Sequence, residues 1–231
     1  MAENLPVNIA IPPGLAITSY NFTDISEGTG IRAYNGANAY TTAGVASYML
    51  TTQTPYSTTV TTSGACTGFT AYTKVIDNDF DVALNLPMDL KGNVFVTVTH
   101  SIASASATQT AQQYVYVKIR KYDGTTETEV ASASGAVLLS PVGTANESAT
   151  SKKRTDTLKI PVTSITHYAP GETFRCTVET WVALSNSGMQ GVSRICHDPQ
   201  NRNDPEGIIV VGSSGASTTK MQCYAPTLID I

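Results

Sequence analysis

The stretch YVYVKIRKYDGTTETEVA, residues 114–131, decides the fold class of this chain. From position 114 to 120, apolar residues alternate with polar or amphipathic ones, which is the period of two that a half-buried strand requires. Asp123-Gly124 suits the positive-φ positions of a tight turn, and residues 126–131 follow as the return strand. The stretch therefore predicts an antiparallel hairpin.

The same alternation recurs in other segments. They are residues 80–86, 94–99, 158–162 and 174–184, of which the last is the longest, and residues 218–231 are expected to form the final strand. Pro161 falls inside one of them and is expected at a sheet edge or bulge. With no amphipathic helix and no internal repeat, the sequence predicts an all-β fold, an antiparallel β-sandwich of jelly-roll-like type.

The N-terminal third is less regular than the rest. Residues 1–30 begin with a proline-rich stretch and are expected to form an extended arm, followed by a single β-sandwich domain over residues 31–231. Within that domain, residues 31–76 have weak periodicity and are expected to form a less regular covering layer. Asn35-Gly36 is a typical turn pair, so a turn is expected there.

Composition and charge limit the classes of partner. Charged residues make up 14% of the chain, against about 25% in typical soluble domains. The net charge of −4 gives no general attraction for nucleic acid. No window approaches the roughly 20 apolar residues of a membrane helix, and residues 1–6 lack the features of a secretory signal. We therefore expect no nucleic-acid or membrane partner, and four reduced cysteines in a protein made in the cytoplasm.

The sequence offers little for catalysis. Its three histidines fall at a predicted strand end (His100), a turn (His167) and a loop (His197). The motifs HExxH and GxSxG and a phosphate-binding glycine loop do not occur. The prediction is that the chain is not an enzyme.

Asp77, Asp79 and Asp81 alternate along one predicted strand. They would share one face, about 6.6 Å apart. That spacing could accept calcium, which binds six to eight oxygen ligands. A solvent-facing carboxylate row that discourages edge pairing is the alternative. No other cofactor is expected.

Residues 196–207 form the densest polar stretch of the chain. His197, Asp198 and Asp204 are the residue types of a metal site. Asp and Asn beside Pro and Gly are equally typical of turns, and Arg202 could pair with Asp198 or a nearby glutamate to hold the loop. The favoured interpretation is a structured interface loop, with His197, Asp198 and Arg202 as its contact residues.

The chain has eleven tyrosines but five phenylalanines and one tryptophan. Tyr114, Tyr116 and Trp181 fall on the polar sides of their predicted strands. Tyrosine and tryptophan suit interfaces, because one end is apolar and the other forms hydrogen bonds. These three are expected to lie under the N-terminal third, against another subunit, or in a sugar-binding platform, which ranks last.

Three stretches in order resemble a known group of proteins. They are KYDGTTETE (121–129), YAPGETFRCTVE (168–179) and HDPQNR (197–202), the last followed by a polar stretch and a C-terminal strand. The order resembles β-sandwich virion proteins of tailed viruses of bacteria and archaea, of the head decoration or other auxiliary type. The resemblance covers roughly residues 77–231.

This resemblance implies a virion structural protein: a capsid decoration or cement protein, or a related tail or neck component. Such a protein would be made in the host cytoplasm and reside in the virion. It would act by adhesion, through residues 1–30 and one sandwich face, to copies of itself and to other capsid or virion proteins. A homo-oligomer is expected, with a trimer as the first expectation.

Two other functions stay open at this point. A carbohydrate- or host-surface-binding module would use the exposed tyrosines and Trp181, with or without calcium. It predicts a shallow aromatic groove beside the Asp77–Asp81 row. A hydrolase would need a pair of acids about 5–10 Å apart in a cleft.

Overall fold

The computed structural model describes residues 18–19, 29–42, 45–53, 61–104, 109–140, 150–197 and 220–228. These residues form β-strands joined by turns, with no helix among them, so the all-β prediction is confirmed. No membrane-spanning helix occurs in this part of the chain. In chain order the strands are β1 (Thr18–Ser19), β2 (Thr29–Thr42), β3 (Val45–Thr51), β4 (Thr61–Thr67), β5 (Thr73–Ala83), β6 (Met88–Ser104), β7 (Ala111–Tyr122), β8 (Glu127–Ser134), β9 (Leu138–Leu139), β10 (Thr150–Tyr168), β11 (Thr173–Leu184), β12 (Gln190–Cys196) and β13 (Met221–Leu228).

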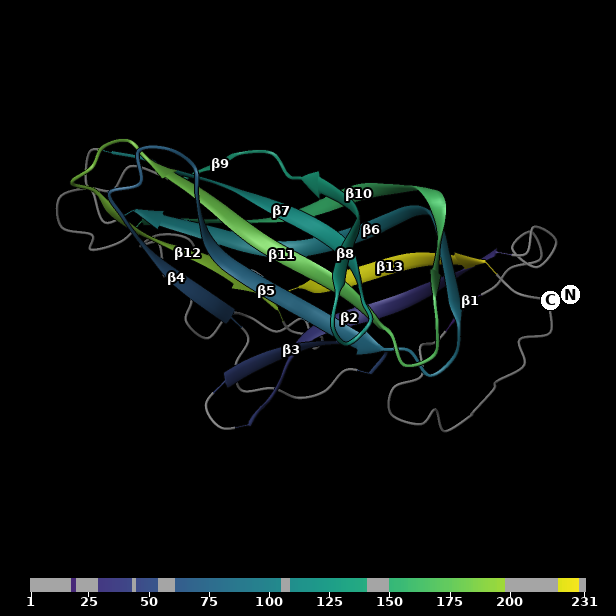
Figure 1. Cartoon of the computed structure of the whole chain (residues 1–231). Helices are drawn as coiled ribbons and strands as arrows, with labels where there is room; N and C mark the ends of the chain where they lie inside the picture. Colours follow the sequence, from purple (N-terminus) through teal and green to yellow (C-terminus); the bar gives the residue numbers. More distant parts are fainter. Residues whose placement is uncertain are drawn as a thin grey trace, which may run out of the picture.

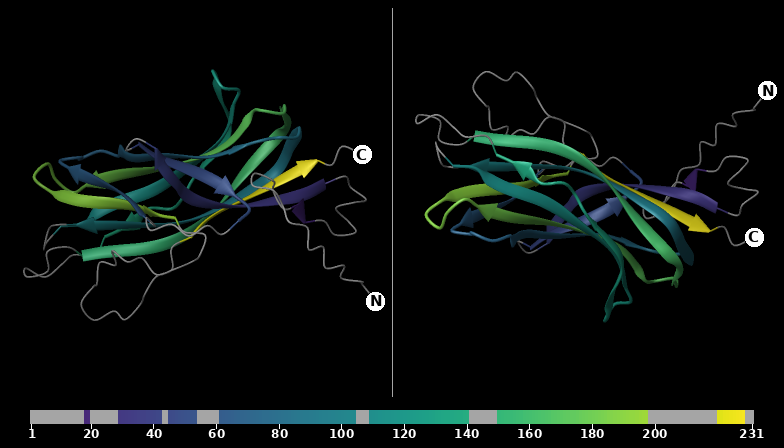
Figure 2. Two further views of the ribbon diagram at one scale, coloured as in Figure 1. Left: turned by 90° about the horizontal axis from the view of Figure 1, so that it is seen from below. Right: turned by 90° about the horizontal axis from the view of Figure 1, so that it is seen from above.

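The strands are arranged in two packed layers (Figures 1 and 2). The β11 layer has the order β5-β11-β7-β8, with β9 beside β8 on the same edge of β7. In the β6 layer, β10 pairs with one edge of β6, and β12 and β13 both pair with the other edge. β4 pairs with the outer edge of β12, and β2 pairs with the outer edge of β13. β3 joins the layers, pairing antiparallel with β2 and parallel with β5. The two layers therefore share one hydrogen-bonded network of mostly antiparallel strands, with a single parallel junction among the described pairs.

Consecutive strands repeatedly change layer. The chain crosses between β5 and β6, returns from β6 to β7, and crosses again between β10 and β11 and between β11 and β12. This alternation is the path expected of a jelly-roll-like sandwich. The predicted N-terminal arm lies largely outside the described residues, of which β1 is the only part before Thr29.

β12 and β13 continue one another along the same edge of β6. Cys196 pairs with Thr99 at the end of β12, and Met221 pairs with the adjacent Val98 at the start of β13. Between them, the backbone N–H of Thr99 donates to the carbonyl of Lys220 at 2.8 Å. The 198–219 segment is thus inserted into what is otherwise a continuous edge pairing.

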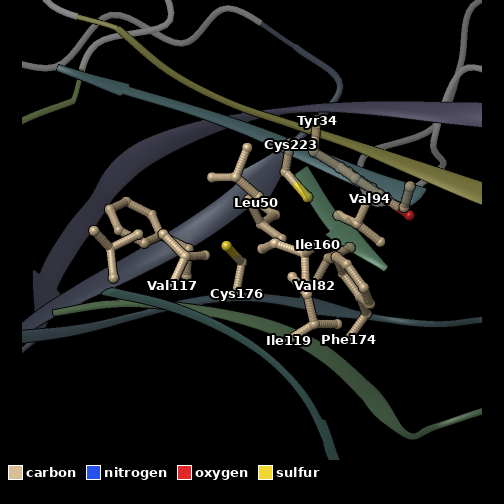
Figure 3. Packing of buried hydrophobic residues seen from close by; sticks show 14 of the residues in the cluster. Tyr34, Leu50, Val82, Val94, Val117, Ile119, Ile160, Phe174, Cys176 and Cys223 are labelled. Carbon is tan, nitrogen blue, oxygen red and sulfur yellow. The ribbon is translucent and has the colours of Figure 1, made fainter. Parts of the chain in front are cut away.

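The core lies between the layers and is built from the inward side of every long strand. Val94, Val96 and Val98 on β6 are fully buried, as the alternation of that segment predicted. Phe174 on β11 packs against Tyr34 of the opposite layer, with ring centroids 5.8 Å apart. Figure 3 shows how side chains from both layers meet in this cluster. Each fully buried Val, Ile or Phe stabilises the fold by about 1.5–3 kcal/mol.

The turn expected at Asn35-Gly36 is wrong, because both residues lie inside β2. A Cβ on Gly36 would approach Cγ of Met221 to 2.2 Å and Cδ1 of Phe80 to 3.1 Å. The glycine therefore serves close packing of two core side chains. A glycine that permits such an approach gives the same sequence signal as one in a turn.

The predicted hairpin between β7 and β8 is confirmed. Gly124 has φ of +97°, and Asp123 Oδ1 accepts the backbone N–H groups of Thr125 at 2.9 Å and Thr126 at 2.7 Å. The expectation that residues 174–184 form the longest strand is wrong. β10 has 19 residues and β6 has 17, against 12 in β11.

Candidate functional site

The outward side of the β11 layer, called here the outer β11 face, gathers most of the predicted site residues. The register places Trp181 opposite Tyr114 and Glu179 opposite Tyr116. On the other edge of β11, Glu179 lies opposite Asp77. Because alternate residues of adjacent strands share a side of the sheet, three separate stretches of sequence meet on this face.

Aromatic side chains run across one end of the face. The aromatic row consists of Tyr72, Tyr114 and Trp181. The rings of Tyr114 and Trp181 are parallel, with 2° between their planes and 6.4 Å between centroids. Tyr72 packs edge-on against Tyr114 at 5.0 Å and donates from its hydroxyl to Oε1 of Gln112 at 2.9 Å. Burial raises the pKa of Tyr114. Tyr116 lies outside the row, with its hydroxyl 2.7 Å from that of Ser132.

A buried carboxylate lies beside the aromatic row. Glu179 has no exposed surface, and its Oε2 accepts the indole N–H of Trp181 at 2.8 Å. Lys118 Nζ lies 2.7 Å from Oε1, and Lys74 Nζ lies 3.6 Å from the same oxygen. A buried charge is tolerated only when such partners satisfy it. Glu179 therefore fixes one ring and two ammonium groups in place.

Arg175 anchors the other end of the face. Its guanidinium binds both carboxylate oxygens of Asp81 at 2.7 Å and lies 3.0 Å from Glu127 and 3.2 Å from Asp79. The guanidinium carbon also lies 4.9 Å from the ring centroid of Tyr122. The hydrogen bonds to Asp81 raise the pKa of Arg175 above its already high usual value. Ion pairing of this bidentate kind holds a long side chain in one geometry.

The predicted aspartate row does lie on one outward side of β5, but each carboxylate has a partner. Asp77 pairs with Lys74, and Asp81 pairs with Arg175. Asp79 Oδ1 accepts the hydroxyl of Thr177 at 2.6 Å. Among the described residues no group of three or more His, Cys, Asp or Glu side chains is placed to hold a metal ion. Calcium binding at this row stays a prediction, and an incoming ion would have to displace lysine and arginine.

His197 is separated from the outer β11 face. It is 1% exposed and packs against the rings of Tyr48 at 5.3 Å and Phe80 at 5.9 Å. Its Nε2 lies 3.1 Å from the hydroxyl of Thr62. His197 is thus an interior residue at the end of β12. Asp198, Arg202 and Asp204 lie outside the described residues.

A second polar cluster was not predicted from the sequence. His100, on the inward side of β6, lies with Nε2 3.0 Å from Asp156 Oδ2 and Nδ1 2.8 Å from the amide of Gln113. Arg154 donates to the same Asp156 oxygen at 2.7 Å. Burial acts to raise the pKa of Asp156, but the hydrogen bonds from His100 and Arg154 outweigh it and lower that pKa. The cluster joins β6 and β10 to β7, and the partners of His100 that it contains are a carboxylate and an amide.

One sequence signal pointed to this cluster: His100 follows a series of apolar residues on the inward side of its strand. Positions 94, 96 and 98 are valines, so a histidine at 100 predicts a buried polar contact. The identity of its partners required the fold, because Gln113 and Asp156 come from two other strands.

A cleft of about 480 Å³ lies between the β7–β8 hairpin and the far end of β10. Its lining is polar, with hydroxyl, carboxylate and ammonium groups. The ammonium group, Lys121, is bound to Glu172 Oε2 and to the His167 carbonyl, each at 2.7 Å. Lining residues are Lys121, Asp123, Thr128, Glu129, Val130, Val162, Thr163, Ser164, Thr166 and Glu172.

No protein family and no curated protein matches this sequence. Among solved structures, a CocE/NonD family hydrolase from Staphylococcus aureus is 14% identical with a TM-score of 0.38, over 84% of this chain and 36% of the hydrolase. An aminopeptidase from a marine sediment Thaumarchaeota archaeon is 10% identical with a TM-score of 0.45, over 84% and 37%. A structure of infectious bursal disease virus, Gx strain, gives 9% identity and a TM-score of 0.28, over 87% and 43%.

The chain spans less than half the length of each of these proteins. With identities and TM-scores this low, the likenesses say nothing about activity.

Proposed function

We propose that this protein is a structural component that acts by adhesion, with the outer β11 face as a binding surface for neighbouring subunits. The observation that carries the proposal is the aromatic row, set beside charged side chains that are already paired with one another. Tyrosine, tryptophan and arginine are the residues that contribute most binding energy at protein interfaces.

The paired charges make the face suited to association. Arg175, Lys118 and Lys74 are each held by carboxylates, so their side-chain entropy is already lost before a partner arrives. Binding costs about 0.5–1.5 kcal/mol for each long side chain that has to be ordered. A face ordered in advance avoids much of this cost. Its cross-strand ion pairs also provide cationic partners for the buried carboxylate of Glu179.

The resemblance to virion proteins gives the proposal its biological setting. We place the chain as an auxiliary virion component, of the capsid decoration or cement type, which binds copies of itself and other virion proteins. Many copies held by surface burial need no catalytic centre, and stable contacts of this kind bury about 1,200–2,000 Å² in total. A homotrimer is the expected assembly.

The test is the self-association of variants, measured by sedimentation equilibrium. Tyr72→Ala removes a ring that is 37% exposed and is expected to weaken association at least about tenfold, typical of an interface aromatic. The control is Ile165→Ala, which removes a 54% exposed side chain from β10. Equal effects of the two changes, or a wild-type chain that stays monomeric at all concentrations, would sink the proposal.

A carbohydrate- or host-surface-binding function is the second candidate. The parallel rings of Tyr114 and Trp181, beside the amide group of Gln112, favour it, since sugars bind to aromatic rings flanked by hydrogen-bonding groups. Calorimetric titration with a panel of oligosaccharides, with and without a calcium chelator, separates this function from adhesion. Binding that disappears in the Trp181→Ala variant would support it.

A further inference from the structure

The outward side of the β6 layer carries an apolar patch that is separate from the outer β11 face. Ile31, Phe95 and Tyr224 are 45%, 41% and 37% exposed. Tyr224 lies opposite Phe95 on one side and Ala33 on the other, and Ile31 lies opposite Pro226. These five residues from β2, β6 and β13 are called the β6 patch. Contiguous exposed apolar surface of this kind marks an interaction site.

Cationic side chains border the patch. Lys159 of β10 lies opposite Phe95, and Lys91 is on the same outward side of β6. Both side chains are exposed. A ligand that suits this surface is therefore an extended apolar segment with negative or no charge.

Residues 5–11 of this chain have that chemistry. Leu5, Val7, Ile9 and Ile11 alternate with proline, asparagine and alanine, which is the period-two pattern of a strand with one apolar side. Residues 1–31 contain Glu3, Asp24 and Glu27 and no lysine or arginine. Residues 5–11 carry no charged side chain, so the segment matches the apolar pattern of the β6 patch and brings no cation toward the bordering lysines.

β1 brings this part of the chain to the patch. Ser19 pairs with Ile31 and Thr18 with Arg32, so the chain reaches the sheet directly beside the patch, on the edge of β2 away from β13. The 17 residues before Thr18 can span up to about 55 Å when extended. That reach is long enough to place residues 5–11 on the β6 patch of an adjacent copy.

We infer that the β6 patch binds the apolar side of residues 5–11 from a neighbouring copy of the chain. The inference rests on the proposed adhesive function and names a second contact for it. Each copy then presents two surfaces, the outer β11 face and the β6 patch, and donates one segment.

Cysteine crosslinking between two different variants tests the contact. One variant carries Val7→Cys, Ile9→Cys or Ile11→Cys, and the other carries Phe95→Cys. The two are mixed and exposed to a small disulfide, and crosslinked dimers are counted on a non-reducing gel. The four native cysteines are buried and do not compete. The control replaces Phe95→Cys by Leu86→Cys, at a residue that is 61% exposed in the turn before β6.

At least one segment position is expected to crosslink to position 95 about tenfold more than to position 86, a ratio that corresponds to 1.4 kcal/mol of preference. No excess over the control would show that the patch does not bind the segment. A third variant carries a segment cysteine and Phe95→Cys in one chain; crosslinking within that chain, with none between the two mixed variants, would show that the segment covers its own copy and would overturn the contact between copies. Crosslinking between copies that persists in Tyr72→Ala, with association otherwise unchanged, would refute the outer β11 face while leaving this contact standing.

Discussion

Replacing Lys118 by methionine is expected to destabilise the protein, because Glu179 is buried and Lys118 is its nearest cation. The ammonium group lies 2.7 Å from Glu179 Oε1 and is itself only 17% exposed. Removing one partner of a buried ion pair costs about 3–5 kcal/mol. Lys74 at 3.6 Å and the indole of Trp181 at 2.8 Å remain as partners. We therefore expect a loss of about 2–3 kcal/mol in the free energy of unfolding, somewhat below that range, because these two partners remain.

Urea denaturation at pH 7 measures this loss, and a thermal melt should show a midpoint lower by about 5–10 °C for a domain of this size. The control is Lys152→Met, which removes an exposed lysine from β10 and should change stability by less than about 0.5 kcal/mol. Adding Glu179→Gln to Lys118→Met should restore at least about 1 kcal/mol, since the unpaired charge is then gone. If Lys118→Met matches the control, or if the second change adds to the loss, then Lys118 does not stabilise the protein by neutralising Glu179.

Three other results are expected. Gly36→Ala should cost about 1–3 kcal/mol in urea denaturation, because its Cβ would lie 2.2 Å from Met221 Cγ in a packed core; an unchanged midpoint contradicts this. Burial acts to raise the pKa of Asp156, but hydrogen bonds hold that pKa below its usual value. The contribution of ionised Asp156 to the stability of the fold is therefore present above about pH 4 and is lost as the pH falls through the lower folded pKa. Asp156→Asn should therefore flatten the loss of stability with acid below about pH 4, and an unchanged slope would exclude this role. A thiol reagent should label none of the four buried cysteines in the native protein and all four in denaturant. Burial also raises the pKa of Cys66 to about 11, which keeps its thiol protonated at neutral pH. Rapid labelling of the native protein would contradict the burial of these side chains.

The strands and their faces were the part of the fold most accessible from sequence. Val115, Val117 and Ile119 are fully buried as their alternation predicted, and the Asp123-Gly124 turn forms the β7–β8 hairpin. Period and turn chemistry are local properties, so a single stretch contains enough information to predict them.

The pairing of strands could not be predicted in the same way. β11 lies between β5 and β7, whose sequences are far from it, and β12 and β13 share an edge of β6 although 24 residues lie between Cys196 and Met221. Which strands pair depends on how apolar side chains are buried across the whole domain, and a short stretch of sequence does not contain that information.

The candidate site was predicted in part for the same reason. The sequence placed Tyr114 and Trp181 on outward sides, and the structure brings them into contact. Tyr72 was missed because it lies outside any strand, and Glu179 because nothing local distinguishes a buried carboxylate from an exposed one. His197 was expected in an interface loop, whereas its side chain lies inside.

Oxidative footprinting of Tyr72 and Trp181 by hydroxyl radicals measures the exposure of the outer β11 face as the chain assembles. Across a concentration series that populates the assembled state, we expect the oxidation of both side chains to fall at least about tenfold, with Leu86, 61% exposed, as the internal reference. Assembly that leaves Tyr72 and Trp181 as reactive as in the dilute chain would contradict the account.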